Sequence, residues 1–167
     1  MFEHLNTPEE VFSFKLGSAL KMEQQLATFL EDLERSTERT EIKRALSEHR
    51  EETIQHARNI EKCFTLLDEA VDDSPCPVID VIASDSKATI EKTDDALVDV
   101  VILAAAAESE HYEIAVYETL VTQADARGAT DVAHLLRRNL NEEEHALEVA
   151  RTTMETIARE GIAVATA

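Results

Sequence analysis

Glu108-Ser-Glu-His-Tyr-Glu-Ile-Ala-Val-Tyr-Glu-Thr-Leu120 is the stretch that decides the fold, because it places carboxylates where a helix should be apolar. One helical face is apolar except at Glu110, with Glu113 one turn along. That face consists of Val100, Leu103, Ala107, Glu110, Ile114, Tyr117 and Val121. Carboxylates rarely lie inside a protein unless they are paired, protonated or bound to metal. The stretch therefore predicts either a buried carboxylate site or a face that has been assigned wrongly.

The composition favours long helices in one domain. The 167 residues include three Gly, three Pro and no Trp, and they suffice for a core without disulfides. The formal net charge of -19 repels nucleic acid and anionic lipid, so we expect neither nucleic acid nor a membrane as a partner. An excess of 35 acidic over 16 basic residues is also typical of a halophilic cytosol. In that case the melting temperature should rise from low to molar salt.

The cysteines and the N-terminus indicate a reducing compartment. Cys63 and Cys76 form neither a Cys-x-x-Cys pair nor a disulfide framework. The N-terminus lacks a basic segment followed by an apolar one, and no run approaches the roughly 20 apolar residues of a membrane span. We therefore expect a soluble, cytoplasmic protein.

The chain is expected to form a single all-α domain over residues 1–167, with long helices over residues 7–36, 39–70, 93–127 and 130–160. Thr7-Pro8-Glu9-Glu10 is a helix start with a capping box and Pro at the first helical position. Pro75 and Pro77 interrupt the chain after the second helix. Residues 71–92 then form a crossover with one or two short helices, long enough to return the chain along the bundle. Gly128 ends the third helix.

Each long helix interrupts its apolar row with a glutamate: Glu23, Glu52, Glu110 and Glu143. His56 lies one turn after Glu52 on the same face. At a rise of about 1.5 Å per residue, the four glutamates fall within roughly one turn of the same level. A single inward glutamate is usually a misassigned face, but four at one level argue for a shared site.

Four inward glutamates with one or more histidines match the di-iron or di-manganese site of ferritin-like four-helix bundles. Two divalent cations that prefer oxygen ligands offset the repulsion and desolvation of the carboxylates. A core of neutral, protonated glutamates is the alternative, and it is energetically expensive.

Three stretches, over residues 45–53, 105–117 and 140–144, resemble the YciE/YciF-like family of ferritin-like stress proteins. Glu-His-Tyr-Glu-Ile-Ala, at residues 110–115, is the most distinctive of their motifs. The resemblance covers nearly the whole chain, from about Pro8 to Met154. It implies a homodimer of helical bundles, iron binding and a stress-linked role, and it does not establish a reaction.

The resemblance also implies six metal ligands: Glu23 as a terminal ligand, Glu52 and Glu143 as bridges, His56 on one metal, and Glu110 with Glu113 on the other.

The sequence departs from the usual ferritin-like pattern at two places. The second helix carries Glu-x-x-x-His in place of Glu-x-x-His, and position 147 is Leu147 where relatives are often acidic. Glu142 and His145 have the ferritin spacing, but His145 lies off the core row, so both are lesser candidates. His49 is another lesser candidate, expected to support a ligand. Tyr117 is expected to pack in the core and can also hydrogen-bond a ligand.

The leading functional hypothesis is redox chemistry at two iron ions, with manganese or mixed metals as alternatives. Ferrous ions would be oxidised by peroxide or dioxygen. The second hypothesis is a metal-free or structurally metallated bundle that serves as an interaction protein without catalysis. Iron storage in a cage is less expected, because no motif for 24-fold assembly is evident.

Overall fold

The computed structural model describes residues 4–72 and 74–165, with side chains up to residue 160. Over these residues the chain is helical and contains no strand, so the all-α prediction is confirmed. The elements in order are α1 (Pro8–Ser36), α2 (Thr40–Leu66), α3 (Pro77–Ile90), the 3-10 turn η1 (Asp95–Leu97), α4 (Val98–Ala126) and α5 (Thr130–Ala165).

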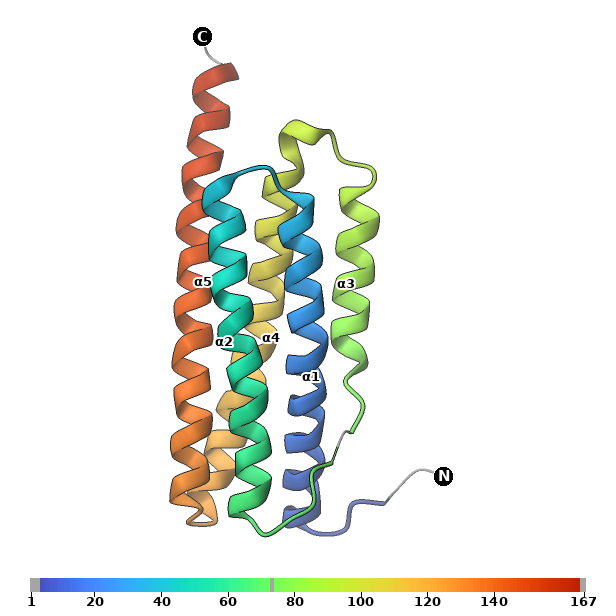
Figure 1. The fold of residues 1–167 in the computed structure, drawn as a ribbon, viewed down its shortest axis with the longest axis vertical. Helices are drawn as coiled ribbons and strands as arrows, with labels where there is room; N and C mark the ends of the chain where they lie inside the picture. Colours follow the sequence, from blue (N-terminus) through green and yellow to red (C-terminus); the bar gives the residue numbers. More distant parts are fainter. Residues whose placement is uncertain (1–3, 73, 166–167) are drawn as a thin grey trace.

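The four long helices form a bundle in which α1 and α2 make one antiparallel hairpin and α4 and α5 make the other (Figure 1). Helix α3 runs along the outside and carries the chain back along the bundle, so α2 and α4 point in the same direction. This topology is that of a ferritin-like bundle with one long crossover. It lets all four long helices contribute side chains to one interior level.

Helix α1 begins as the sequence predicts. The side chain of Thr7 accepts a hydrogen bond from the Glu10 backbone N–H at 3.1 Å, and the Glu10 carboxylate accepts one from the Thr7 N–H at 3.2 Å. Pro8 occupies the first helical position, where its missing N–H has no intrahelical partner to lose. The capping box thus fixes where the first long helix starts.

Helix α2 ends at Leu66, earlier than the expected residue 70. Asp68 adopts a left-handed conformation with φ 58°, and its N–H bonds the Thr65 carbonyl at 3.3 Å. The Glu69 N–H reaches the Phe64 carbonyl at 3.0 Å. These two bonds form a Schellman motif, which stops the helix well before the prolines do.

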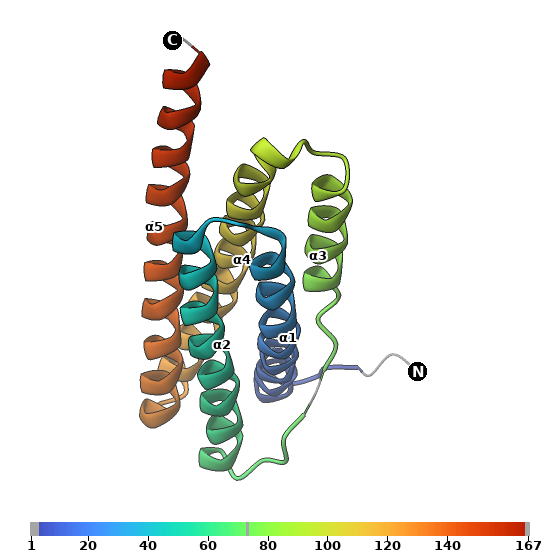
Figure 2. The same cartoon turned by 45° about the horizontal axis from the view of Figure 1, so that its top comes forward.

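Helix α4 ends in the same motif, now with Gly128 at φ 73°. Its start lies at Val98, later than the expected residue 93, because η1 precedes it. Helix α5 runs past the expected residue 160 to Ala165, and its C-terminal end projects beyond the other helices in both views (Figures 1 and 2).

The segment after α2 packs closely on α1 at Gly17. A Cβ atom at this position would lie 3.0 Å from the backbone oxygen of Asp72, so a larger residue would push the segment away. Further along the same connection, the Pro75 carbonyl accepts a hydrogen bond from the Ser18 hydroxyl at 3.1 Å. These contacts hold the crossover against the bundle.

Candidate metal centre

A buried layer of ionisable side chains crosses the middle of the bundle. Every long helix contributes to it, and each member is at most 8% exposed: Glu23 from α1, His49 and His56 from α2, Glu110 and Glu113 from α4, and Glu143 from α5. Buried charged groups need partners or a metal, because water no longer solvates them. The layer is therefore the feature of this fold that requires an explanation.

The first cluster brings together His49, Glu110, Glu113 and Glu143, whose potential ligand atoms all lie within 4.8 Å of one another. Nε2 of His49 is 3.1 Å from Oε1 of Glu110 and 3.4 Å from Oε2 of Glu143. Three helices thus meet around one small volume.

The second cluster contains Glu23, His56 and Glu143, again with ligand atoms within 4.8 Å of one another. Nδ1 of His56 is 2.7 Å from Oε1 of Glu143 and 3.7 Å from Oε2 of Glu23. Glu143 belongs to both clusters, so the two positions are adjacent and share one carboxylate.

Many of these buried atoms lack a hydrogen bond of acceptable geometry to any described residue. They include Oε2 of Glu23, Nε2 of His49, Nδ1 of His56, Oε2 of Glu110, Oε2 of Glu113 and both oxygens of Glu143. Short distances such as that between His56 and Glu143 are present, but the directions are poor for hydrogen bonds. Buried polar atoms are nearly always paired, and a metal ion accepts lone pairs converging in this way. The donor set fits a metal centre.

Burial dominates the protonation behaviour of the layer. Desolvation raises the pKa of Glu23 and Glu143 and raises that of Glu113 well above its ordinary value. Desolvation lowers the pKa of His56, but the adjacent carboxylates of Glu143 and Glu23 outweigh it and raise the pKa to about 10. In the metal-free chain, protons therefore take the place of cations in neutralising the site.

Each histidine turns its second ring nitrogen to a carboxylate at the edge of the layer. Nδ1 of His49 lies 3.3 Å from Oε2 of Glu52, and Nε2 of His56 lies 2.7 Å from Oε2 of Glu142. Arg138 holds Glu142 through a 3.0 Å hydrogen bond from Nε. Metal-binding histidines commonly have such carboxylate partners, which fix the tautomer and the ring orientation.

Tyr117 supports the layer from the apolar side. Its hydroxyl donates a short hydrogen bond to Oε1 of Glu23 and accepts one from Nδ2 of Asn139 at 3.0 Å. Asn59 donates to Oδ1 of Asn139 at 2.7 Å, so a buried polar chain extends from Glu23 away from the layer. The tyrosine thus packs in the core and also holds a candidate ligand.

Sequence similarity places the chain in a known family. The family model described as "Domain of unknown function (DUF892)" matches residues 7–163. Protein YciF of Escherichia coli (strain K12) is 31% identical over 153 residues, which cover 90% of this chain and 92% of that protein. The chain is a member of the YciE/YciF-like family.

Solved structures of family members share the fold. The E. coli stress protein YciF has a TM-score of 0.88 at 28% identity, covering 93% of this chain and 99% of that one. YcfI from Rhodopseudomonas palustris has a TM-score of 0.87 at 29% identity, covering 91% and 98%. The predicted family is therefore confirmed. None of the helices, over the residues described, has the length and apolar character to cross a membrane.

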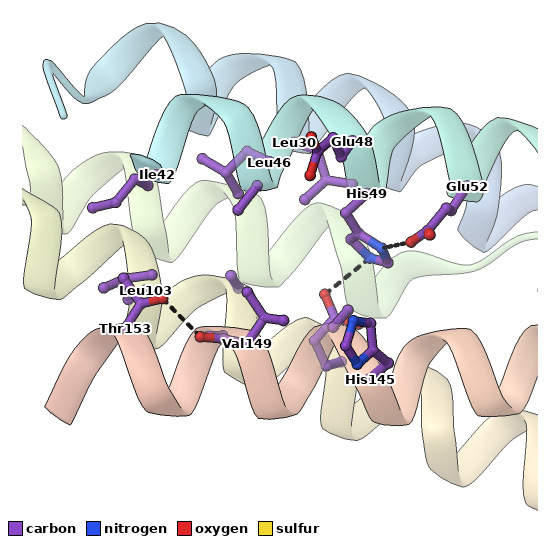
Figure 3. A pocket seen from close by; sticks show the side chains of 15 residues that line it. Leu30, Ile42, Leu46, Glu48, His49, Glu52, Leu103, His145, Val149 and Thr153 are labelled. Atoms are coloured by element: carbon purple, nitrogen blue, oxygen red, sulfur yellow. Dashed lines mark hydrogen bonds and ion pairs between the residues drawn. The ribbon is translucent and has the colours of Figure 1, made fainter. Parts of the chain in front are cut away.

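The structure brings together five of the expected ligands of this family member: Glu23, His56, Glu110, Glu113 and Glu143. Glu52, expected as a bridge, lies outside both clusters with 45% of its side chain exposed. Glu142 also lies outside them, at His56. His145 is exposed at the edge of a pocket beside the layer (Figure 3). His49, expected to support a ligand, lies in the first cluster.

The inner row of α2 differs from the expected one at two positions in the first half of the helix. Leu46 and Thr53 are buried, whereas the expected row contained Glu52. Thr53 satisfies its hydroxyl within the helix by donating to the His49 carbonyl at 3.0 Å, so it is tolerated inside. Glu52 is thereby turned toward the surface.

Two signals in the sequence point to His49. It stands seven residues before His56, which is two helical turns on the same face. Both candidate rows of α2, one through Ala45 and Glu52 and the other through Leu46 and Thr53, contain His49. Asn59 and Asn139 carry no such signal, because polar residues on a helix are usually solvated.

Proposed function

We propose that this chain binds two divalent metal ions, iron in the first instance, at the buried layer and uses them for redox chemistry with dioxygen or peroxide. The observation that carries the proposal is the set of inward-facing atoms without hydrogen-bond partners on Glu23, Glu110, Glu113, Glu143 and the two histidines. Manganese or a mixed pair also suits oxygen and imidazole ligands.

The charge of the layer favours two ions. Four carboxylates carry four negative charges, which two divalent cations balance when both imidazoles are neutral. A single ion would leave two buried negative charges for protons to neutralise. The division into two clusters that share Glu143 supports the same number.

The residues divide between the two positions. His49, Glu110 and Glu113 would hold one ion, and Glu23 with His56 would hold the other. Glu143 would serve both, since it is the member common to the clusters. Glu52 and Glu142 would then orient the imidazoles through their outer nitrogens.

Bound ferrous ions supply electrons for the reduction of peroxide or dioxygen. The protein contributes a fixed set of carboxylates, and Tyr117 keeps one of them, Glu23, in place. Buried apolar residues on the same helices, such as Leu26 one turn after Glu23 and Leu120 two turns after Glu113, would limit the access of water. The physiological role would be iron or peroxide handling under stress, in keeping with the description of the E. coli relative as a stress protein.

A second candidate is a bundle in which metal, if bound, serves only the fold. The description of the R. palustris relative YcfI as a candidate structural protein favours it. An acidic surface with net charge -19 would then mediate interaction, and a second copy of the chain remains the predicted partner. The mass in solution tests the predicted homodimer.

Ferrous oxidation separates the two candidates. Protein purified without chelator is loaded anaerobically with ferrous iron, and ferric absorbance is followed after dioxygen or peroxide is added. We expect oxidation faster than that of iron in buffer, lost in Glu110→Ala and retained in Glu108→Ala, an exposed neighbour on the same helix. Equal rates in all three proteins and buffer would support the structural candidate.

A further inference from the structure

We propose that a pocket beside the metal centre binds a small, uncharged and largely apolar organic molecule, whose single polar group reaches His49 and Glu110. This proposal extends the proposed function. It rests on that function in one respect, namely that His49 and Glu110 belong to the metal centre. The pocket holds about 120 Å³ and lies between α2, α4 and α5 (Figure 3).

Aliphatic side chains form much of the pocket wall, and Glu48, Glu52, His145 and Thr153 add polar atoms to it. Ile42, Leu46, Leu103 and Val149 extend from three helices into the space on one side of His49, as Figure 3 shows. These aliphatic side chains offer no ligand to a cation, so the part of the volume that they enclose does not suit an ion. They do suit hydrocarbon groups, whose removal from water is favourable.

Small residues create the space. Ala106 on α4 and Ala146 and Ala150 on α5 line the pocket, at positions where larger aliphatic side chains would fill it. Ala106 lies one turn before Glu110, and Ala150 lies two turns after Glu143. The alanines thus leave room directly beside the buried layer, although helices of this kind usually fill such gaps with larger residues.

The inner end of the pocket is polar and lacks partners. His49 and Glu110 both line it, and Nε2 of His49 and Oε2 of Glu110 have no hydrogen-bond partner among the described residues. A hydroxyl or a similar group at this end could donate to the carboxylate or bind a metal held there. The pocket therefore offers unpartnered polar atoms beside an apolar surface, as small-molecule sites commonly do.

Charge and size restrict the class of ligand. Glu48, Glu52 and Glu110 all line the pocket, and the net charge of the chain is -19, so an anion is repelled on approach. The volume is comparable with that of engineered cavities of ~150 Å³ that bind benzene, and it exceeds what dioxygen requires. A neutral molecule with about six or seven non-hydrogen atoms fits these limits.

Phenol is a suitable probe, because it combines a hydrocarbon ring with one hydroxyl. Binding to the full-length, metal-free protein would be measured by ligand-observed NMR and by calorimetry. We expect one saturable site with a Kd on the order of 1 mM or tighter, and weaker binding of benzene, which lacks the hydroxyl. In protein loaded with cobalt(II), phenol should also change the visible absorption of the metal.

Variants that fill the pocket locate the binding site. Ala150→Leu should weaken phenol binding at least tenfold without lowering the melting temperature, because the new side chain occupies existing space. Ala146→Leu, nearer the mouth and half-buried, is a second variant in case the first folds poorly. Ala115→Leu, at an exposed position on α4, is the matched control and should bind as the wild type does.

Absence of saturable phenol binding to the wild type, or wild-type affinity in folded Ala150→Leu and Ala146→Leu proteins, would overturn the pocket proposal. Such a result leaves ferrous oxidation unaffected. Conversely, phenol binding in a chain that fails to take up metal would retain the pocket and reject the proposed function.

Discussion

Glu143 and His56 meet inside the bundle, with 2.7 Å between Oε1 of the glutamate and Nδ1 of the histidine. The other oxygen of Glu143 lies 3.4 Å from Nε2 of His49. A single carboxylate on α5 therefore contacts both imidazoles of α2, and the two clusters cannot be altered independently at this residue. Substitution of a side chain that belongs to one cluster alone should affect metal binding at that cluster only.

Glu113→Gln should lower metal binding from two ions per chain to one, because Glu113 belongs only to the first cluster. The same change should stabilise the metal-free protein by about 1 kcal/mol, or roughly 2–4 °C in melting temperature. Burial raises the pKa of Glu113, so ionising it in the folded chain is unfavourable, and glutamine removes that penalty. Metal analysis and thermal unfolding test both parts, with exposed Glu118→Gln as the control. Two tightly held ions in Glu113→Gln would contradict the assignment.

The outer carboxylates should change affinity without changing the number of ions. Glu142→Gln leaves the His56 ring without its charged partner, and Glu52→Gln does the same for His49. We expect metal affinity to fall by about 10–100-fold in each case. Competition with a chelator of known affinity measures the change, and exposed Glu144→Gln serves as the control. Loss of an entire ion from Glu52→Gln would instead make Glu52 a ligand, as the family resemblance implies.

The apolar rows of the sequence predict much of the fold and of the buried layer. In α1 and α5, large aliphatic residues stand on both sides of Glu23 and Glu143, so the helical face is unambiguous. In α2 the middle of the row is polar, and two rows one residue apart share Ile42, His49 and His56. Hydrophobic periodicity does not show whether Glu52 or Thr53 faces the core, because packing against the other helices determines which side chain is buried.

The end of α2 shows a second limit. Pro75 and Pro77 are visible helix breakers, but the helix ends at a left-handed Asp68. Aspartate adopts that conformation only occasionally, so its identity predicts a stop far less strongly than Gly128 does. The bonds that end the helix run from the Glu69 N–H to the Phe64 carbonyl and from the Asp68 N–H to the Thr65 carbonyl. They form only in the folded chain, so the sequence does not reveal them.

The metal-free protein should lose stability as the pH rises. The pKa of His56 is about 10 in the folded chain against an ordinary 6.5, so its contribution is complete below pH 6.5 and is lost toward pH 10. The raised pKa values of Glu23, Glu113 and Glu143 act in the same direction from about pH 4.5 upward. Urea unfolding with chelator should give a lower free energy of unfolding at pH 10 than at pH 6.5. Bound metal should reduce this slope, because it replaces the protons.

Tyr117→Phe should destabilise the protein by about 1–3 kcal/mol, since it leaves buried Glu23 and Asn139 with one partner fewer. Tyr112→Phe is the control, because that hydroxyl is only half-buried and contacts Cys76 Sγ at 3.5 Å. Chemical unfolding of both variants measures the difference. Equal stability of the two would show that the Tyr117 hydroxyl does not support the layer.

The most direct test of the account is an anaerobic titration of the metal-free chain with ferrous iron, followed by the number of tightly bound ions per chain. The wild type should bind two, and Glu143→Gln should bind neither tightly, because both clusters share that carboxylate. A wild type that binds no iron, manganese or cobalt, or a Glu143→Gln protein that retains two tight ions, would contradict a dinuclear centre built around Glu143.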